Sequence, residues 1–281
     1  MGSKTVAIIG QGYVGLTISA FAARSYQVVG FDNSQRVVDQ LNQGISHIEG
    51  VKSEDIKAAI TAGNYRATSD GVDIAGADIV VIAVPTPLNK DRKPDLTFIE
   101  AACKTIAENI NHPVLVINES TSYPGTIRGV IKPLIEKLSA GKVDHLYAIS
   151  PERVDPGRVD WDQKNTPRLY AGLTPEASKQ TREFYSSFCD KLVEVSSPEV
   201  AEAAKLFENT FRQVNIALVN EFAQIADALG ISGREVIDAA STKPYGFMQF
   251  NPGPGVGGHC IPVDPSYLAH VANQVGVPAT F

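Results

Sequence analysis

Short, uninterrupted runs of apolar residues, rich in valine and isoleucine, alternate with amphipathic stretches of helical period along the first part of the chain. The five clearest runs occupy residues 5–10, 27–32, 77–85, 112–118 and 145–150. Polar residues do not alternate with the apolar ones inside these runs, so strands formed by them must be buried on both faces. Buried strands separated by helices predict an α/β fold with a Rossmann-like, doubly wound parallel sheet.

The pattern changes at Ser197, where a long helix is expected to begin. Ser197 is a suitable N-cap, Pro198 fits the first helical position, and no helix breaker follows until Gly230. A helix of this length does not belong to an ordinary Rossmann crossover. We therefore expect the Rossmann-like domain to span residues 1–197 and a smaller all-helical domain to span residues 198–281.

Shorter elements are expected around these features. A helix over residues 126–140 must be capped or kinked at Pro133, because proline cannot donate a backbone hydrogen bond. The other expected elements are strands at 168–172 and 191–195, a helix that begins near Thr174 and Pro175, and helices at 232–242 and 264–276.

Composition narrows the classes of partner and the compartment. The 281 residues include 25 Lys and Arg against 31 Asp and Glu, for a net charge of -6, with no basic run that could neutralise several phosphates. Nucleic acid is therefore not an expected partner. No stretch approaches the roughly 20 consecutive apolar residues that cross a bilayer, so no membrane partner is expected either. The first residues enter a strand without the features of a signal peptide, which predicts a cytoplasmic protein.

The three cysteines are an odd and widely spaced set, which argues against a disulfide framework and against a zinc site. Cys103 and Cys189 fall in helical patterns, where buried thiols are expected. No metal site is predicted.

A dinucleotide-binding fingerprint follows the first predicted strand. Gly10, Gly12 and Gly15 form G-x-G-x-x-G at the start of a helix, and the second strand ends in Asp32. Glycines let backbone amides approach a pyrophosphate, and an acidic side chain at the end of the second strand accepts hydrogen bonds from a ribose diol. Asp32 would repel a 2′-phosphate, which favours NAD over NADP, although Arg36 is a cation near enough to accommodate one.

Three turn-rich segments follow predicted strands, at residues 84–87, 119–126 and 150–157. Ligands bind beyond the carboxyl ends of the strands in an open parallel sheet, so we expect these segments to converge on the nicotinamide. Serine, threonine and proline can equally make turns, but the opposite charges Glu152 and Arg153 need a ligand or each other. The predicted cofactor contacts are Gly10, Gly12, Tyr13, Val14, Gly15, Asp32, Arg36, Pro85, Thr86, Thr121 and Glu152.

The segment at residues 251–265 must be a loop, because prolines exclude regular structure and glycines let the backbone approach a ligand. A cysteine on such a loop, Cys260, is exposed enough to react, and its neighbours His259 and Asp264 could tune its ionisation. A glycine-rich hinge with an incidental cysteine is the alternative interpretation.

Lys205 and Asn209 are four residues apart on the long helix and share a face, with Arg212 on the same side. Such a pair is commonly a solvated helix face. Beside a nicotinamide site and a loop cysteine, it would supply a cation and a hydrogen-bond donor for an oxyanion.

Taken together, these motifs resemble the nucleotide-sugar 6-dehydrogenase family of the UDP-glucose/UDP-N-acetylhexosamine superfamily. The matching segments are GQGYVGL, ESTSYPGT, SPERVDPG, EAAKLFENTFRQVNIALVNE and GPGVGGHCIPVDP, in the family's order. The third and fifth are similar to enzymes that act on UDP-N-acetylglucosamine or UDP-N-acetylmannosamine. UDP-glucose dehydrogenases typically read NPEFL and GGYCLPKD at these places.

The resemblance implies oxidation of a sugar C6 alcohol to a carboxylate with two NAD in succession. It implies that Cys260 captures the aldehyde as a thiohemiacetal, later a thioester, that Lys205 and Asn209 stabilise oxyanions, and that Asp264 orients or activates water. Glu152 and Thr121 would assist at the water and the nicotinamide. The implied substrate-binding residues are Arg153, Lys205, Asn209, Arg212, Phe250, Asn251, Gly255, Gly257, Gly258 and His259.

The family also has a third, UDP-binding domain, which we expect this chain to lack, and a dimer formed through the long helix. The apolar face expected there comprises Phe207, Val214, Leu218, Phe222 and Ile225, a stripe that can equally be ordinary core. Three other functions stay open: a UDP-glucose 6-dehydrogenase, a β-hydroxyacid or 6-phosphogluconate-type dehydrogenase that needs no cysteine, and a catalytically silent NAD-binding dimerisation module.

Overall fold

The computed structural model describes residues 4–155, 160–258 and 261–279. The chain divides into two compact units. Unit 1 comprises the residues up to Pro87 and Asp95–Lys205, and unit 2 comprises Leu88–Pro94 and the residues from Leu206 onward. The division falls within the long helix, whereas we expected the domain boundary at the start of that helix.

Unit 1 is built on a sheet whose described part has eight strands in the order β3-β2-β1-β4-β5-β6-β7-β8. The strands are β1 Thr5–Ile9, β2 Gln27–Phe31, β3 Tyr65–Thr68, β4 Ile79–Ile82, β5 Leu115–Asn118, β6 Leu146–Ile149, β7 Arg168–Gly172 and β8 Leu192–Glu194. The strands from β3 to β6 are parallel, whereas β7 runs antiparallel to β6 and β8 runs parallel to β7. The predicted strands are confirmed, and β3 is an additional edge strand.

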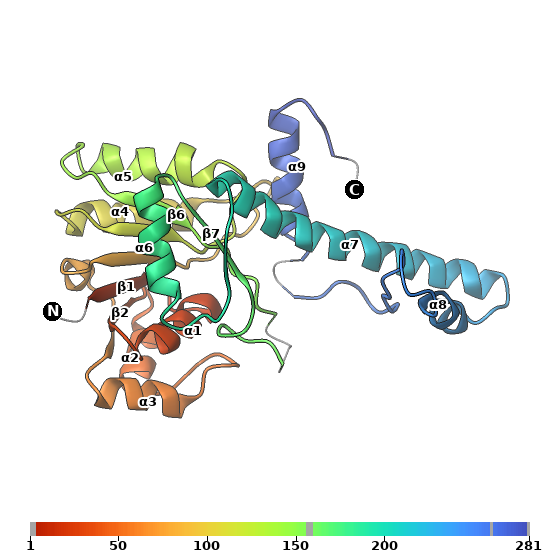
Figure 1. Cartoon of the computed structure of the whole chain (residues 1–281), viewed down its shortest axis with the longest axis horizontal. Coiled ribbons are helices and arrows are strands. Elements are labelled where there is room, and N and C mark those ends of the chain that lie inside the picture. The colour runs from red at the N-terminus through yellow and green to blue at the C-terminus, as the bar shows by residue number, and fades with distance from the viewer. Residues whose placement is uncertain (1–3, 156–159, 259–260, 280–281) are drawn as a thin grey trace. The chain divides into compact units, whose positions relative to one another are not determined.

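Helices cover both faces of this sheet, as a doubly wound fold requires. One face carries α1 Tyr13–Ala22, α2 Gln35–Asn42, α3 Ser53–Thr61 and α6 Pro175–Tyr185, and the other carries the short 3-10 helix η1 Gly71–Ile74, α4 Thr97–Asn109, the π-helical turn η2 Ile127–Ile131 and α5 Lys132–Leu138. Figure 1 shows α4 and α5 together on one side of the strands, opposite α1.

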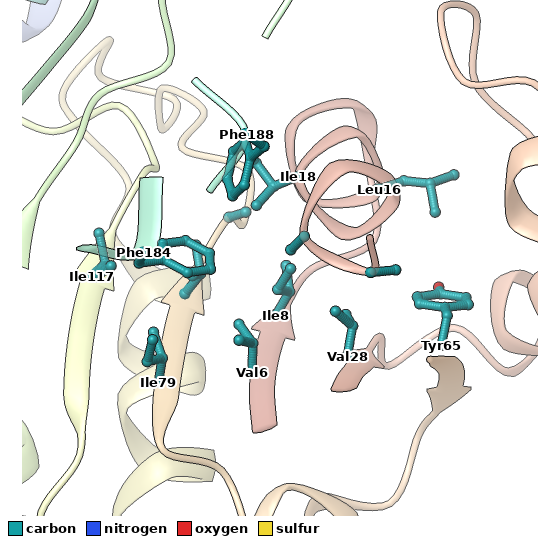
Figure 2. Close-up of a cluster of buried hydrophobic side chains, with 14 of the residues drawn as sticks. Val6, Ile8, Leu16, Ile18, Val28, Tyr65, Ile79, Ile117, Phe184 and Phe188 are labelled. Carbon is teal, nitrogen blue, oxygen red and sulfur yellow. The ribbon is translucent and has the colours of Figure 1, made fainter. Parts of the chain in front are cut away.

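Successive residues of one strand belong to different cores. Val6 and Ile8 of β1 pack in the cluster under α1 and α6, which Figure 2 shows, while Ala7 and Ile9 pack under α4 and α5. These four side chains are at most 2% exposed. Burial of a valine or isoleucine side chain contributes roughly 1.5–3 kcal/mol, which explains why the runs are apolar throughout.

The expected helix at residues 126–140 changes its hydrogen-bond spacing just before Pro133. The π-helical turn η2 ends at Ile131, and α5 begins at Lys132 with Pro133 in its first turn. Proline lacks the N–H that would continue a regular helical ladder, so the backbone changes its hydrogen-bond spacing before it. The backbone stays helical through Ile131 and Lys132, so what the structure shows at the predicted position is a change of helix type.

The long helix α7, Pro198–Ala228, is continuous and ends before Gly230, which has a φ of +70°. Unit 2 contains most of α7 together with α8 Gly233–Ser241 and α9 Asp264–Gln274. Figure 1 shows α8 beside the C-terminal half of α7. The loop after α8 is tied to α7 by the N–H of Gly253, which donates to Asn220 Oδ1 at 2.8 Å. No helix in the described residues is long and apolar enough to span a membrane.

A buried carboxyl of α7 anchors the loop after β5 within unit 1. Glu202 is 1% exposed and accepts hydrogen bonds from Ser122 Oγ at 3.1 Å, Gly125 N at 2.6 Å and Ile127 N at 3.2 Å. Burial raises the pKa of Glu202 from 4.5 to about 7, against the opposing effect of these donors. The loop that carries Thr121 is therefore held by a group that titrates near neutral pH.

Glu202 should make the stability of unit 1 depend on pH. Because its folded-state pKa lies above its ordinary value, its stabilising contribution is complete below pH 4.5 and is lost as the pH rises to about 7. Relative to Glu202→Gln, the wild type should lose on the order of 1–3 kcal/mol of unfolding free energy over this interval. Urea unfolding at several pH values measures it.

Glu199→Gln is the matched control on the same helix. Its hydrogen bond from Arg128, 2.7 Å long, lowers the pKa of Glu199, so the difference between the wild type and this variant should have the opposite sign with pH. A constant gap between the wild type and Glu202→Gln across the interval would contradict the assignment.

Candidate functional site

A pocket of about 300 Å³ lies in unit 1 beyond the carboxyl ends of β1, β2 and β4, where the strand order reverses. This is the ligand-binding crevice of a doubly wound sheet. Its lining residues are Ile9, Gly10, Gly12, Phe31, Asp32, Asn33, Ala83, Val84, Pro85, Phe98, Ala101, Ala102 and Thr105. Four predicted cofactor residues are among them. From the sequence, α4 was not predicted to form one wall of the pocket. A helical sequence pattern does not indicate which face of the helix contacts a ligand.

The glycines of the fingerprint serve two different purposes. A β-carbon on Gly15 would lie 1.8 Å from the carbonyl oxygen of Gly10, so Gly15 is required by the close approach of α1 to the end of β1. A β-carbon on Gly12 would meet no atom within 4 Å, and its φ of -74° suits any residue. Neither folding nor packing explains Gly12. The open space in front of it, at the N-terminus of α1, fits a pyrophosphate.

Asp32 is held in place at the end of β2. Its Oδ2 accepts the N–H of Gln11 at 2.9 Å, and its Oδ1 accepts the N–H of Ser34 at 2.9 Å. Two backbone donors fix the carboxylate, which lines the pocket and keeps further lone pairs that can accept hydrogen bonds. Arg36 is exposed in the first turn of α2. The geometry fits a ribose diol.

The other predicted cofactor residues lie on segments of unit 1 that follow β1, β4 and β5. Tyr13 and Val14 are half-buried in the first turn of α1, Thr86 is half-buried after β4, and Thr121 is half-buried after β5. Burial raises the pKa of Tyr13, and the negative charge of Glu152 adds to this effect.

Glu152 follows β6 and is 8% exposed. Its Oε1 accepts the backbone N–H groups of Arg153 at 2.7 Å and Val154 at 2.6 Å. Its Oε2 accepts Arg168 Nη2 at 3.1 Å and the side-chain amide of Gln163. From the sequence, a ligand or Arg153 was the expected partner of Glu152. Arg168 was not predicted as a partner, because its position in the sequence is typical of an ordinary strand.

The surroundings of Glu152 keep it ionised. Burial alone would raise the pKa of this carboxyl, but the charge of Arg168 and the hydrogen bonds from Val154 N–H and Gln163 outweigh burial, and Lys205 adds to their effect. The pKa of Glu152 therefore lies below its ordinary value. Lys205 itself is half-buried on α7.

Unit 2 brings two other predicted catalytic residues together. Asn209 Nδ2 on α7 donates to Asp264 Oδ2, the first residue of α9, at 2.5 Å. Asn209 is 7% and Asp264 is 1% exposed. The chain that follows residues 259–260 is thereby fixed to α7. Cys260 and His259, both predicted site residues, lie outside the described residues.

The predicted substrate residues of unit 2 lie on α7 and on the loop after α8. Phe250 packs edge-on against Phe211 of α7, with ring centroids 6.0 Å apart. Arg212 is exposed on α7. The remaining ones are exposed on the loop: Asn251, Gly255, Gly257 and Gly258.

The two described cysteines are buried in unit 1. Burial raises the pKa of the Cys103 thiol to about 12 and that of the Cys189 thiol to about 11. Both are inert thiols at neutral pH, as predicted. Among the described residues, no three His, Cys, Asp or Glu side chains cluster so that they could hold a metal ion.

Comparison with known proteins identifies the family. Residues 4–189 match the NAD binding domain of the UDP-glucose/GDP-mannose dehydrogenase family, and residues 199–281 match its central domain. The chain belongs to this family, which confirms the resemblance inferred from its motifs. NAD is accordingly the cofactor of the first domain, and the open space at Gly12 and the orientation of Asp32 fit it.

Individual relatives agree with this assignment. The chain is 39% identical to Protein CapL from Staphylococcus aureus over 278 residues, which cover 98% of this chain and 64% of CapL. A solved UDP-N-acetyl-D-mannosamine dehydrogenase from Pyrococcus horikoshii is 38% identical with a TM-score of 0.89, covering 95% of this chain and 64% of that protein. A solved UDP-glucose dehydrogenase from Pyrobaculum islandicum is 26% identical with a TM-score of 0.90, covering 98% and 65%. The chain thus spans just under two thirds of each relative.

Substitution at Gly12 should separate binding from folding. Gly12→Ala should leave the unfolding free energy within about 0.5 kcal/mol of the wild type, because its β-carbon meets only open space. It should weaken NAD binding about tenfold or more, roughly 1.4 kcal/mol, because the methyl group occupies the pyrophosphate position. Calorimetric titration with NAD and urea unfolding measure the two quantities.

Gly15→Ala is the matched comparison, since its methyl group would overlap the Gly10 carbonyl. It should cost about 1–3 kcal/mol of stability or more. Wild-type NAD affinity in Gly12→Ala would show that the space in front of Gly12 does not hold the cofactor.

Proposed function

We propose that this chain carries the NAD-binding and catalytic parts of a dehydrogenase that oxidises the C6 alcohol of a UDP-N-acetylhexosamine to the uronic acid. The sugar is UDP-N-acetylglucosamine or UDP-N-acetylmannosamine. Relatives named as UDP-N-acetyl-D-mannosamine dehydrogenases support the substrate class. The observation that carries the proposal is the buried contact between Asn209 and Asp264, which joins the long helix to the residues just after Cys260.

Bound NAD⁺ supplies the hydride acceptor for both oxidation steps. The alcohol first loses a hydride and a proton to give the aldehyde. The Cys260 thiolate then adds to the aldehyde carbon, and the new C–S bond and protonated oxygen make a thiohemiacetal. Loss of a second hydride and proton gives the thioester, and water cleaves the C–S bond to release the carboxylate and the thiol. Each sugar therefore consumes two NAD⁺ and one water and yields two NADH and three protons.

The side chains of α7 and α9 have the chemistry for the oxygen atoms of these intermediates. The amide of Asn209 donates hydrogen bonds and Lys205 carries positive charge, and both stabilise an oxyanion on the C6 oxygen. Asp264 is an acceptor that orients the attacking water. The 2.5 Å bond between Asn209 and Asp264 fixes both groups before substrate arrives, so little ordering is left for the reaction itself.

Residues from unit 1 would serve the nicotinamide and the water. Glu152 is a fixed negative charge near Lys205, and Thr121 is held on the loop that Glu202 anchors. In unit 2, the glycine-rich loop with Phe250 and Asn251 would hold the sugar nucleotide through backbone donors. Arg153 and Arg212 would meet its phosphate and acetamido groups.

Counting NADH tests the proposal. The chain is incubated with excess NAD⁺ and limiting UDP-N-acetylglucosamine, UDP-N-acetylmannosamine or UDP-glucose, and NADH absorbance and sugar acid are measured. About two NADH per N-acetylhexosamine are expected, because the sulfur-bound intermediate again carries a transferable hydrogen. Cys260→Ala should lower formation of the acid by about 1000-fold or more. Cys103→Ala, which removes a buried thiol of high pKa, is the control.

Each alternative has its own signature in this assay. Two NADH from UDP-glucose alone would identify a UDP-glucose dehydrogenase. One NADH per substrate, or full activity in Cys260→Ala, would identify a β-hydroxyacid-type enzyme. Calorimetric binding of NAD with neither binding nor turnover of a UDP-sugar would identify a silent NAD-binding module.

A second copy of this chain is the proposed protein partner. Phe207, Val214, Leu218 and Ile225 form one stripe along α7 and are between 43% and 67% exposed, while Phe222 beside them is half-buried. A contiguous exposed apolar stripe marks an interaction surface more often than a solvated one. The stripe is therefore not core within this chain, and α7 of another copy would cover it.

Charge on this stripe should dissociate the dimer. Leu218→Asp is expected to shift the chain to monomer, because a carboxylate would be buried without a partner. Light scattering coupled to gel filtration measures the mass. Gln224→Asp places the same charge on the exposed side of α7 about 100° away from the stripe and should leave the mass unchanged. A dimer that persists in Leu218→Asp would rule out this interface.

A further inference from the structure

The guanidinium of Arg168, at the start of β7, lies between two buried carboxylates of unit 1. Nη1 donates to Glu119 Oε2 at 3.0 Å, and Nη2 donates to Glu152 Oε2 at 3.1 Å. The side chains of Arg168 and Glu119 are 4% and 0% exposed. Nη1 also donates to Ser150 Oγ at 3.1 Å, and the guanidinium lies 4.5 Å from the ring centroid of Tyr185. The hydroxyl of Tyr185 in turn donates to Glu119.

The carboxylate of Glu152 is held in one orientation by four hydrogen-bond donors. Its Oε1 is held by two backbone N–H groups, and its Oε2 is held by Arg168 and Gln163. A carboxylate with four donors cannot rotate, and it cannot take up a proton without giving up one of these hydrogen bonds. Glu152 is therefore built as a fixed charge, and any assistance that it gives at the water comes from that charge and not from exchange of a proton.

We propose that Arg168 is a positioning residue for the reaction: its guanidinium fixes the ionised carboxylate of Glu152 near Lys205 and is itself held by Glu119. The inference rests on the proposed function, because it needs Glu152 and Lys205 to act in the reaction. The side chain of Arg168 is 4% exposed, so its proposed action on the reaction runs through Glu152.

Arginine suits this position because its two terminal nitrogens reach two different carboxylates at once. A lysine ammonium keeps the charge, but it is a single point that cannot reproduce the fork. Removal of Arg168 alone would leave two buried carboxylates without their shared cation, which strongly destabilises a fold. The variant used to test the role of Arg168 therefore removes the carboxylate of Glu119 together with the guanidinium of Arg168.

Several charged or titratable groups face Glu152 from the surrounding elements. They are Arg168 on β7, Glu119 after β5, Tyr13 on α1, Cys189 after α6 and Lys205 on α7, while Tyr185 on α6 contacts Arg168 and Glu119. Burial raises the pKa of Glu119, with Arg168 opposing and Glu152 adding to the effect. The pKa of Glu119 is thus shifted upward and that of Glu152 downward, although both carboxylates pair with Arg168.

The test follows the ionisation of Glu152 directly in the whole chain. Carbon-13 carboxyl resonances of labelled glutamate are recorded from about pH 5 to 9, and the Glu152 signal is identified by its loss in Glu152→Gln. In the wild type and in Glu119→Gln, which keeps Arg168, the signal should stay ionised throughout. In Arg168→Gln/Glu119→Gln its midpoint should rise by about 1–3 pH units and enter this window. Arg66→Gln, on the exposed edge strand β3, is the matched arginine control and should change nothing.

Activity is the second measurement. The acid limb of the kcat/KM profile for the UDP-sugar should move to higher pH in the double variant by the same amount, with NAD binding unchanged and with normal urea unfolding at pH 8. An unshifted Glu152 signal, or a rise of equal size in Glu119→Gln, would overturn the assignment to Arg168. A shifted signal with an unchanged rate profile would overturn its role in the reaction. Absence of NADH from the wild type refutes the proposed function instead, and the resonance shift still decides whether Arg168 holds Glu152 ionised.

Discussion

A parallel sheet buried on both faces can present polar groups only beyond the ends of its strands. Every residue between the two cores of unit 1 is committed to packing, because Val6 and Ile8 serve one face and Ala7 and Ile9 the other. Most of the predicted cofactor residues of unit 1 are thereby found among the few residues that follow each strand. The glycine turn after β1, Asp32 after β2, the pocket wall after β4 and Glu152 after β6 all lie at this edge.

The buried polar groups at this edge form hydrogen bonds and ion pairs with one another, as burial in a packed interior requires. Glu202 accepts two donors from the loop after β5 and one from the start of η2, and Arg168 bridges Glu119 and Glu152. Such groups would cost several kcal/mol each if they were buried without partners. Because the partners come from different strands and from α7, the same bonds that make burial tolerable also fix the spacing of the loops on which function depends.

Local pattern was enough to predict much of this fold and part of the site. Each feature that was predicted correctly is recognisable from a few neighbouring residues. These features are the apolar runs, the caps of α6 and α7, and the glycines with Asp32. Strand β3 was missed because Tyr65–Thr68 is short, contains Arg66 and lies at the sheet edge, where burial does not enforce an apolar run. The roles of Arg168 and Glu202 were not predicted, because they depend on contacts with residues 49 and 77 positions away in the sequence. A local sequence pattern does not reveal such contacts.

The burial of the two described cysteines gives this chain a chemical selectivity. Thiol reagents attack the thiolate, and the raised pKa values of Cys103 and Cys189 leave almost none of either in that form at neutral pH. Their side chains are also closed to a reagent while unit 1 is folded. Rapid labelling of the native chain by a thiol reagent therefore reports on the remaining cysteine, Cys260. Slow labelling of the other two measures the rate at which unit 1 opens.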